Sequence, residues 1–172
     1  SPSVVVLINA GASAINVNIV SGERSLFTRD VSVGGDAYTD AIARALNVPF
    51  DLAERAKRGV AVPGVPTEEV DRILHQITDD IVLELQKTFD FYRASAESDT
   101  IDRILISGGS AATRGLVEAI SDRFGAAVDL FDPFGRIDIS PALAADAAAM
   151  APTAAVARSE EHTSELQSRG LI

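Results

Sequence analysis

The sequence contains no cysteine among its 172 residues. Without thiols the chain can form neither a disulfide framework nor a thiolate metal site, and side-chain redox chemistry is excluded. This composition suits a reducing cytoplasm. Histidine is also scarce: His75 lies in a predicted long helix with no second histidine near it, and His162 lies close to the end of the chain. We therefore expect no zinc site and a solvent-facing position for His75.

Long apolar runs and an excess of positive charge are missing too. The apolar run at residues 4–8 is far shorter than the roughly 20 residues that span a bilayer, and no charged segment precedes it as in a signal peptide. The formal net charge of −10 argues against a nucleic-acid partner, because that binding depends on clustered lysine and arginine. The 47% hydrophobic content is enough for one ordinary core or for two small lobes that share a cleft.

The two ends of the chain suggest a piece of a longer protein. A strand-like segment follows directly after Ser-Pro-Ser, so we expect the chain to begin partway through a larger fold. Residues 158–168 resemble the translation of a common sequencing adapter, so residues 158–172 are expected to be a non-native tail that takes no part in the fold. A genuine polar tail is the alternative. Because half of a two-lobed cleft exposes apolar surface, such a piece is expected to self-associate.

The first part of the chain predicts three strands and a helix. Residues 4–8 are apolar throughout, as in a strand buried on both faces, and residues 14–20 alternate with period two. Residues 25–33 form the third predicted strand, and small-residue turns separate the three. Asp36 is the predicted N-cap of a helix that extends to about residue 46.

Helical periodicity dominates the middle of the chain. A short helix is predicted at residues 51–57, before Gly59, and a long amphipathic helix at residues 67–96 with Thr67 as its cap. The predicted inward positions of the long helix are Val70, Leu74, Ile77, Ile81, Leu85, Thr88 and Tyr92. No strand signal occurs between residues 47 and 99, so this segment predicts a helical lobe inserted into an α/β lobe.

The last part returns to strand character. Residues 101–106 and 128–131 are predicted strands, and the helix between them carries Leu116, Ile120 and Phe124 inward before it stops at Gly125. The alanine-rich residues 142–157 predict a further helix that begins near Pro152. The complete pattern predicts a mixed α/β fold.

Glycine-bearing turns follow several of the predicted strands: Gly11, then Gly34 and Gly35, then Gly108 and Gly109. Glycine lets backbone N–H groups come close to a ligand, and a helix N-terminus adds partial positive charge that suits phosphate. Each turn taken alone is a weak signal, since a single glycine pair is more often ordinary turn geometry. Neither a Walker A lysine nor the Gly-x-Ser-x-Gly elbow of hydrolases is present.

The joint order of these turns resembles the superfamily of actin, DnaK-type chaperones and sugar kinases. Residues 7–13 (LINAGAS) look like its second phosphate loop, and residues 104–111 (ILISGGSA) look like its adenosine motif. Residues 27–42 and 53–59, as well as Asp132-Pro133-Phe134, are similar to segments of the PilM family, and the first of them also to the division protein FtsA. The resemblance covers nearly all of residues 4–157 in collinear order and fits PilM best.

The resemblance implies the second half of an actin-like (ribonuclease H-like) ATPase fold, with a mixed sheet and an inserted, mainly helical subdomain. Residues 1–46 correspond to the first part of subdomain 2A, residues 47–99 to subdomain 2B and residues 100–141 to the second part of 2A. Residues 142–157 correspond to a truncated helix that returns toward the first half of the protein.

The same resemblance assigns a nucleotide role to particular residues. Gly11, Ala12 and Ser13 would present backbone N–H groups and a hydroxyl to the β- and γ-phosphates of ATP or ADP. Gly34, Gly35 and Asp36 would approach the ribose and phosphates. Glu54 would accept from ribose hydroxyls, Lys57 would lie along the base or ribose, and Gly108, Gly109 and Ser110 would form the floor under adenine. The plain alternatives are a solvated ion pair for Glu54 and Lys57 and an ordinary N-cap for Ser110.

Asn9 departs from the pattern of the superfamily, whose loop begins with an aspartate that organises Mg²⁺ and water. An amide cannot act as a general base or bring charge to the metal, although it can hold a metal-bound water. We therefore expect ATP or ADP binding with Mg²⁺, slow or absent hydrolysis, and no catalytic residue of the chain's own.

The family also implies a role and a partner. PilM proteins serve type IV pilus assembly as cytoplasmic scaffolds at the inner membrane, where they bind the cytoplasmic tail of PilN. That tail docks on the first half of the protein, so none of its contacts is expected here. Three alternatives remain open: an FtsA-like filament protein of cell division, a small-molecule kinase of the same superfamily, and a scaffold that has lost its nucleotide.

Overall fold

The computed structural model describes residues 2–96 and 100–131. These residues form one five-stranded mixed sheet in the order β3-β2-β1-β4-β5, together with four helices. The mixed α/β class expected from the sequence is therefore confirmed. The Asp132-Pro133-Phe134 motif, the predicted helix at 142–157 and the residues suspected to be an adapter translation lie outside the described residues.

The chain opens with an antiparallel meander, as predicted. It consists of β1 (Val4–Ala10), β2 (Ile15–Ser21) and β3 (Arg24–Val31). The register of β1 against β2 runs from Val4 opposite Ser21 to Ala10 opposite Ile15. A register shift in β2 between Ile19 and Val20 marks a bulge in its pairing with β3.

Two parallel strands complete the sheet. β4 (Arg103–Ser107) pairs with β1 in parallel, and β5 (Ala127–Leu130) pairs with β4 in parallel. Parallel strands need a crossover connection. Between β1 and β4 this connection includes the hairpin partners and all of the first three helices, and between β4 and β5 it is α4 (Leu116–Phe124).

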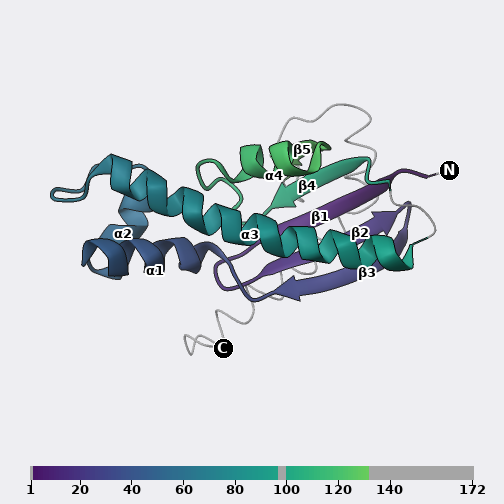
Figure 1. Ribbon diagram of the computed structural model, residues 1–172, viewed down its shortest axis with the longest axis horizontal. Coiled ribbons are helices and arrows are strands. Elements are labelled where there is room, and N and C mark those ends of the chain that lie inside the picture. The colour runs from purple at the N-terminus through teal and green to yellow at the C-terminus, as the bar shows by residue number, and fades with distance from the viewer. Residues whose placement is uncertain (1, 97–99, 132–172) are drawn as a thin grey trace, which may run out of the picture.

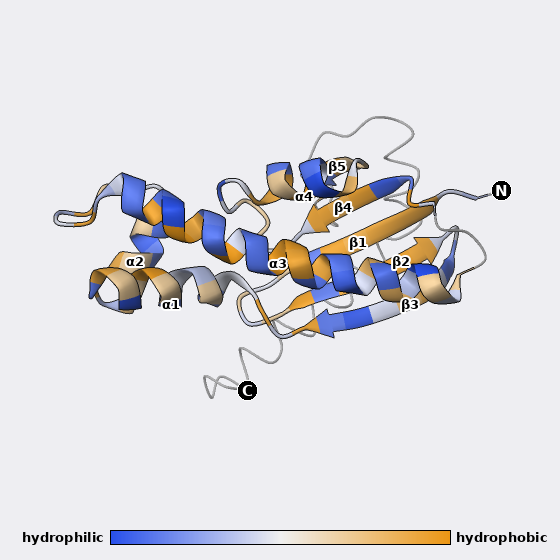
Figure 2. Cartoon of the chain, in the orientation of Figure 1, coloured by the Kyte–Doolittle hydropathy of each residue, from blue (hydrophilic) through white to orange (hydrophobic). Residues whose placement is uncertain are grey.

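Side chains of the strands alternate between two cores. Val4, Val6, Ile8 and Ala10 of β1 belong to the large core that the helices complete, because successive side chains in a strand point to opposite faces. Val5 and Leu105 belong to a smaller cluster on the other face. Figure 2 shows the apolar stretch along β1 and β4 in the middle of the sheet. This central position matches the strand that the sequence predicts to be buried on both sides.

Three helices connect β3 to β4. They are α1 (Gly35–Leu46), α2 (Phe50–Lys57) and α3 (Thr67–Ser95). Figure 1 shows α1, α2 and the first part of α3 beyond the end of the sheet, while the rest of α3 crosses a face of the sheet. α1 packs against both α2 and α3. No helix in the described ranges combines enough length with enough apolar character to cross a bilayer.

The predicted N-caps are wrong at two helices. α1 begins at Gly35 with Gly34 as its cap, so Asp36 lies inside the first turn, where a carboxylate faces the positive end of the helix dipole. α3 begins at Thr67 itself, after Pro66. The extended cap residue lies two residues before the polar side chain in α1 and directly before it in α3, and neither helix has a side-chain cap hydrogen bond.

The buried stripe of α3 is wider than predicted. Six of the seven predicted inward residues are buried and Ile77 is partly buried, but Ile73, Thr78 and Phe89 are buried as well. Thr78 is polar, and its hydroxyl lies 2.6 Å from the hydroxyl of Tyr38 on α1. This hydrogen bond joins α1 to α3 inside the core, where Tyr38 has no exposed surface.

Replacing Tyr38 with phenylalanine should lower the free energy of unfolding by about 1–3 kcal/mol, because the hydroxyl of Thr78 loses its partner. Urea denaturation measures this cost. The double variant Tyr38→Phe/Thr78→Val removes both polar groups and should recover most of the loss. If the double variant loses the sum of the two single effects, the hydrogen bond does not join these helices.

Candidate functional site

Three strands that point the same way end at one edge of the sheet. β1 and β4 are parallel, and β3 runs in the direction of β1 because both are antiparallel to β2. After these strands come Gly11, Gly34 with Gly35, and Gly108 with Gly109. In open α/β sheets, ligands bind outside the carboxyl ends of the strands. The topology therefore brings the predicted glycine turns to the edge where a ligand is expected.

The turn after β1 is hydrogen-bonded to the start of α1. The backbone N–H of Gly35 donates to the carbonyl oxygen of Gly11 at 2.9 Å, and that of Asp36 donates to Ala12 at 2.8 Å. Gly34 lies so close to this turn that an added Cβ would stand 2.6 Å from the carbonyl oxygens of both Gly11 and Ala12. Glycine at 34 is thus required by the approach of the two backbones.

The turn after β4 joins the same cluster. The backbone N–H of Ser110 donates to the carbonyl of Ala10 at 3.0 Å, and its hydroxyl donates to the carbonyl of Gly11 at 3.1 Å. Ser110 is therefore not an N-cap, since α4 begins six residues later at Leu116, after Gly115. A Cβ on Gly35 would stand 2.0 Å from the Ser110 hydroxyl oxygen, so all three turns meet at this point.

Glu54 and Lys57 of α2 face this cluster and are not a solvated ion pair. The Lys57 ammonium lies 3.0 Å from a Glu54 carboxylate oxygen, and only 10% of its side chain is exposed. It also donates to the carbonyl of Gly35 at 3.4 Å. The buried hydroxyl of Thr39 donates to Glu54 at 2.6 Å, and the exposed Arg58 pairs with its other oxygen at 3.2 Å. Thr39 was not predicted from the sequence, in which it looks like any polar helix residue.

Burial alone would raise the pKa of the Glu54 carboxyl, but hydrogen bonds from Thr39 and Lys57 and the charges of Lys57 and Arg58 outweigh it. They hold the pKa below its ordinary value of 4.5. An ionised Glu54 therefore contributes stability above pH 4.5, and this contribution is lost as the pH falls through the lower folded-state pKa.

The expected result is a pH-dependent difference in unfolding free energy between the wild type and Glu54→Gln. The difference should be constant above pH 4.5 and should shrink in more acidic solution. Chemical denaturation across this pH range measures it. A difference that grows on acidification would contradict the arrangement.

Some of the predicted ligand groups already form hydrogen bonds within the turns, whereas others belong to exposed residues. The N–H of Gly11 donates to Ala14 at 3.0 Å, so it serves the turn itself. Ala12 and Ser13 are exposed at the tip of that turn. Gly109 is exposed too, and a Cβ there would meet nothing within 4 Å. Ala12, Ser13 and Gly109 are therefore the predicted backbone ligands of the three turns that are exposed.

Asn9 lies near the end of β1, one residue before its last position. A Cβ on Gly108 would stand 2.6 Å from the Asn9 side-chain oxygen, so this amide packs directly against the turn after β4. Within residues 2–96 and 100–131, no group of three or more acidic, histidine or cysteine side chains could hold a metal ion. His75 is exposed, as predicted, and lies 3.5 Å from Asp79 one turn along α3.

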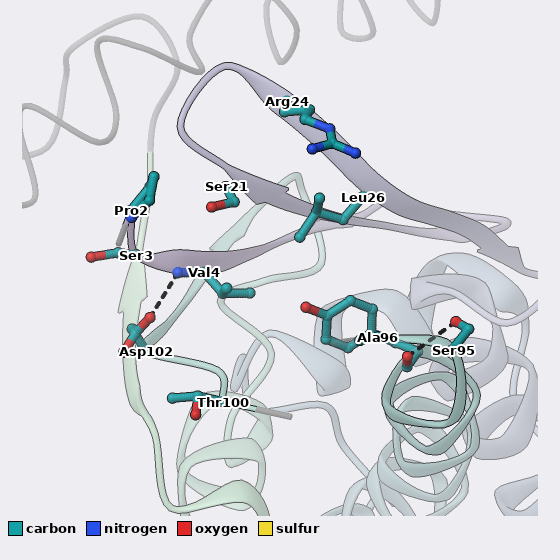
Figure 3. Close-up of a pocket in the computed structure, with 11 residues that line it drawn as sticks. Pro2, Ser3, Val4, Ser21, Arg24, Leu26, Ser95, Ala96, Thr100 and Asp102 are labelled. Atoms are coloured by element: carbon teal, nitrogen blue, oxygen red, sulfur yellow. Dashed lines mark hydrogen bonds between the residues drawn. The ribbon is translucent and has the colours of Figure 1, made fainter. Parts of the chain in front are cut away.

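A separate cavity of about 760 Å³ lies at the opposite end of β1. Its walls come from the end of α3, the β2–β3 turn and the residues before β1 and β4. Figure 3 shows Arg24 and Leu26 on one side and Asp102 on the other, where the Asp102 carboxylate accepts the Val4 N–H at 2.7 Å. None of the glycine turns lines this cavity, so it is distinct from the candidate site.

Solved structures with the same fold are actin-like proteins. A PilM–PilN type IV pilus biogenesis complex matches with a TM-score of 0.68 and 21% identity, covering 81% of this chain and 39% of that chain. The archaeal actin homologue Ta0583 in complex with ADP matches with a TM-score of 0.63 and 18% identity, over 92% of this chain and 51% of that one. MreB 5 of Spiroplasma citri bound to AMPPNP matches with a TM-score of 0.61 and 16% identity, over 75% and 48%.

The chain thus spans between 39% and 51% of the length of these structures. At such identities the match shows the fold, which is that of actin-like ATPases. The sequence profile of the family described as "Type IV pilus assembly protein PilM" matches residues 1–158, which is most of the chain. The chain belongs to the PilM family of type IV pilus assembly proteins.

Proposed function

We propose that this chain is the nucleotide-binding half of a cytoplasmic scaffold for type IV pilus assembly, and that ATP or ADP occupies the space above the three glycine turns. The observation that carries the proposal is the meeting of Gly11, Gly35 and Ser110 at one point. Their mutual hydrogen bonds build a rigid floor, and a preformed site avoids the entropic cost of ordering loops on binding.

The polar groups around this floor suit a nucleotide. Ala12 and Ser13 are exposed, and their backbone N–H groups would bind phosphate oxygens, while Gly109 leaves room for a flat base. Lys57 and Arg58 carry two positive charges next to the single negative charge of Glu54. The α2 side of the site is therefore net positive and attracts phosphate. Glu54 keeps acceptor capacity for ribose hydroxyls in addition to the bonds it already accepts.

The side chain of Asn9 supports a site that binds ATP or ADP and that hydrolyses ATP slowly or not at all. Its neutral amide packs against Gly108 and supplies no negative charge to a metal. A Mg²⁺ ion that takes its ligands from phosphates and water fits this residue set, and its charge would neutralise the phosphates. In this proposal the nucleotide sets the relative orientation of the two lobes of the full-length protein, and a ligand does so only by binding one orientation better than the other.

The proposed partner is a PilN-like cytoplasmic tail, in agreement with the solved PilM–PilN complex. The tail would dock on a part of the PilM fold that this chain does not cover. Residues 47–99 would then act as subdomain 2B, and the two flanking segments as subdomain 2A. The proposed location is the cytoplasmic side of the inner membrane, where PilN would hold the scaffold.

Titration of the full-length protein with a fluorescent ATP analogue tests nucleotide binding. We expect saturable binding that unlabelled ATP and ADP reverse, and turnover well below about 1 per second. Lys57→Met should weaken binding by about tenfold, the effect of losing one nearby charge at partial burial. Lys87→Met is the matched control, because Lys87 forms the same type of pair with Glu84 three residues away on α3. Equal affinities of the two variants, or fast hydrolysis, would contradict the proposal.

A further inference from the structure

The turn after β4, residues 108–115, is held by side-chain contacts near both of its ends. At its start, Ser110 bonds to the carbonyls of Ala10 and Gly11. Near its other end, the Arg114 guanidinium forms an ion pair with Asp71 in the first turns of α3. A single short segment therefore connects the glycine turns to the helices that lie beyond the sheet (Figure 1).

Arg114 also contacts the turn that follows α2. A Cβ on Gly59 would stand 3.3 Å from a guanidinium nitrogen of Arg114, so the guanidinium lies against this glycine. Gly59 comes directly after Arg58 and two residues after Lys57. The guanidinium thus contacts both the helix α3 and the turn that follows the helix that carries Glu54 and Lys57.

We propose that Arg114 is a positioning residue of the nucleotide site. Its contacts hold the turn after β4, which would lie under the base, in a fixed position relative to Glu54 and Lys57 of α2. This inference rests on the proposed function. Arg114 itself need not touch the nucleotide: its ion pair limits how far the turn that carries Gly109 can move away from α2 and Glu54. Without it, the turn and α2 are free to separate, and the nucleotide leaves faster.

The size of the effect follows from the exposure of the pair. Arg114 and Asp71 are 47% and 52% exposed, and exposed pairs of this kind change an equilibrium by up to about fivefold. Salt screens exposed charges, so the effect should diminish as ionic strength rises. A contribution through packing alone would not depend on salt.

The experiment measures the release rate of a fluorescent ADP from the full-length protein, chased with unlabelled ADP. Arg114→Ala should release the nucleotide about three to five times faster than the wild type. Arg114→Lys should restore part of the loss because it keeps the charge. Arg72→Ala is the matched control: Arg72 is an exposed arginine that pairs with Glu69, three residues away within α3. This control should release nucleotide at the wild-type rate.

A double-variant cycle identifies the partner. Asp71→Ala should also release the nucleotide faster than the wild type, and Asp71→Ala/Arg114→Ala should match Arg114→Ala, since the pair is already broken in that single variant. Additive effects, or release from Arg114→Ala no faster than from Arg72→Ala, would overturn the inference while leaving the proposed function intact. A wild-type protein that binds no fluorescent ADP would overturn both.

Discussion

Replacing Gly108 with alanine should lower the free energy of unfolding by about 2–5 kcal/mol and abolish nucleotide binding. Gly108 has a φ of +97°, which L side chains rarely adopt, and a Cβ would stand 2.5 Å from the Ala10 carbonyl oxygen. That oxygen accepts the N–H of Ser110, so it cannot withdraw without breaking the bond that holds the turns together. Urea denaturation measures the loss of stability, and titration with the fluorescent nucleotide measures the loss of binding.

Gly109→Ala is the control for this prediction. Gly109 is the next residue, yet a Cβ there meets nothing within 4 Å and its φ is not positive. Its unfolding free energy should stay within about 0.5 kcal/mol of the wild type. Equal destabilisation by the two substitutions would mean that the contact between the β4 turn and β1 is not what requires glycine at 108.

Replacing Phe89 with alanine should cost about 3–5 kcal/mol of stability, a large part of what a domain of this size possesses. Phe89 is fully buried, and its ring meets Phe124 of α4 edge-on at a centroid distance of 4.6 Å. The contact fixes α4 against α3, and α4 follows the turn that carries Gly108 and Ser110. Thermal and urea unfolding both report the cost.

Phe91 offers a matched control on the same helix. It is 69% exposed, so Phe91→Ala removes a similar ring without opening a cavity. Its stability should change by no more than about 0.5 kcal/mol. If Phe91→Ala were as destabilising as Phe89→Ala, the side of α3 that packs on the sheet would be assigned wrongly.

The strands and helices could be predicted because their burial is periodic. β1 is apolar on both faces, and β2 alternates, so period and composition identify both. The edges of the buried stripe of α3 are harder to predict. This 29-residue helix packs on α1 and α2 along its first part and on the sheet along the rest. Phe89 and Ile73 lie beside the central stripe, and only tertiary packing shows that both sides of it are covered.

The turns of the candidate site could be predicted from glycine placement, but their hydrogen bonds could not. The N–H groups of Gly35 and Asp36 serve the carbonyls of Gly11 and Ala12, which leaves fewer free donors than the motif suggests. Arg114 was not predicted as part of this region, since its partner Asp71 lies 43 residues away in sequence. Contacts of such separation follow from topology and leave no local pattern.

Amide hydrogen exchange of the full-length protein, with and without ADP, tests the central claim most directly. We predict that saturating ADP slows exchange together at residues 9–13, 34–37 and 107–111, most at the exposed Ala12, Ser13 and Gly109, and leaves residues 21–26 of the distant cavity unchanged. Slower exchange at only one of the three turns, or at none of them, would contradict a single nucleotide site built from all three.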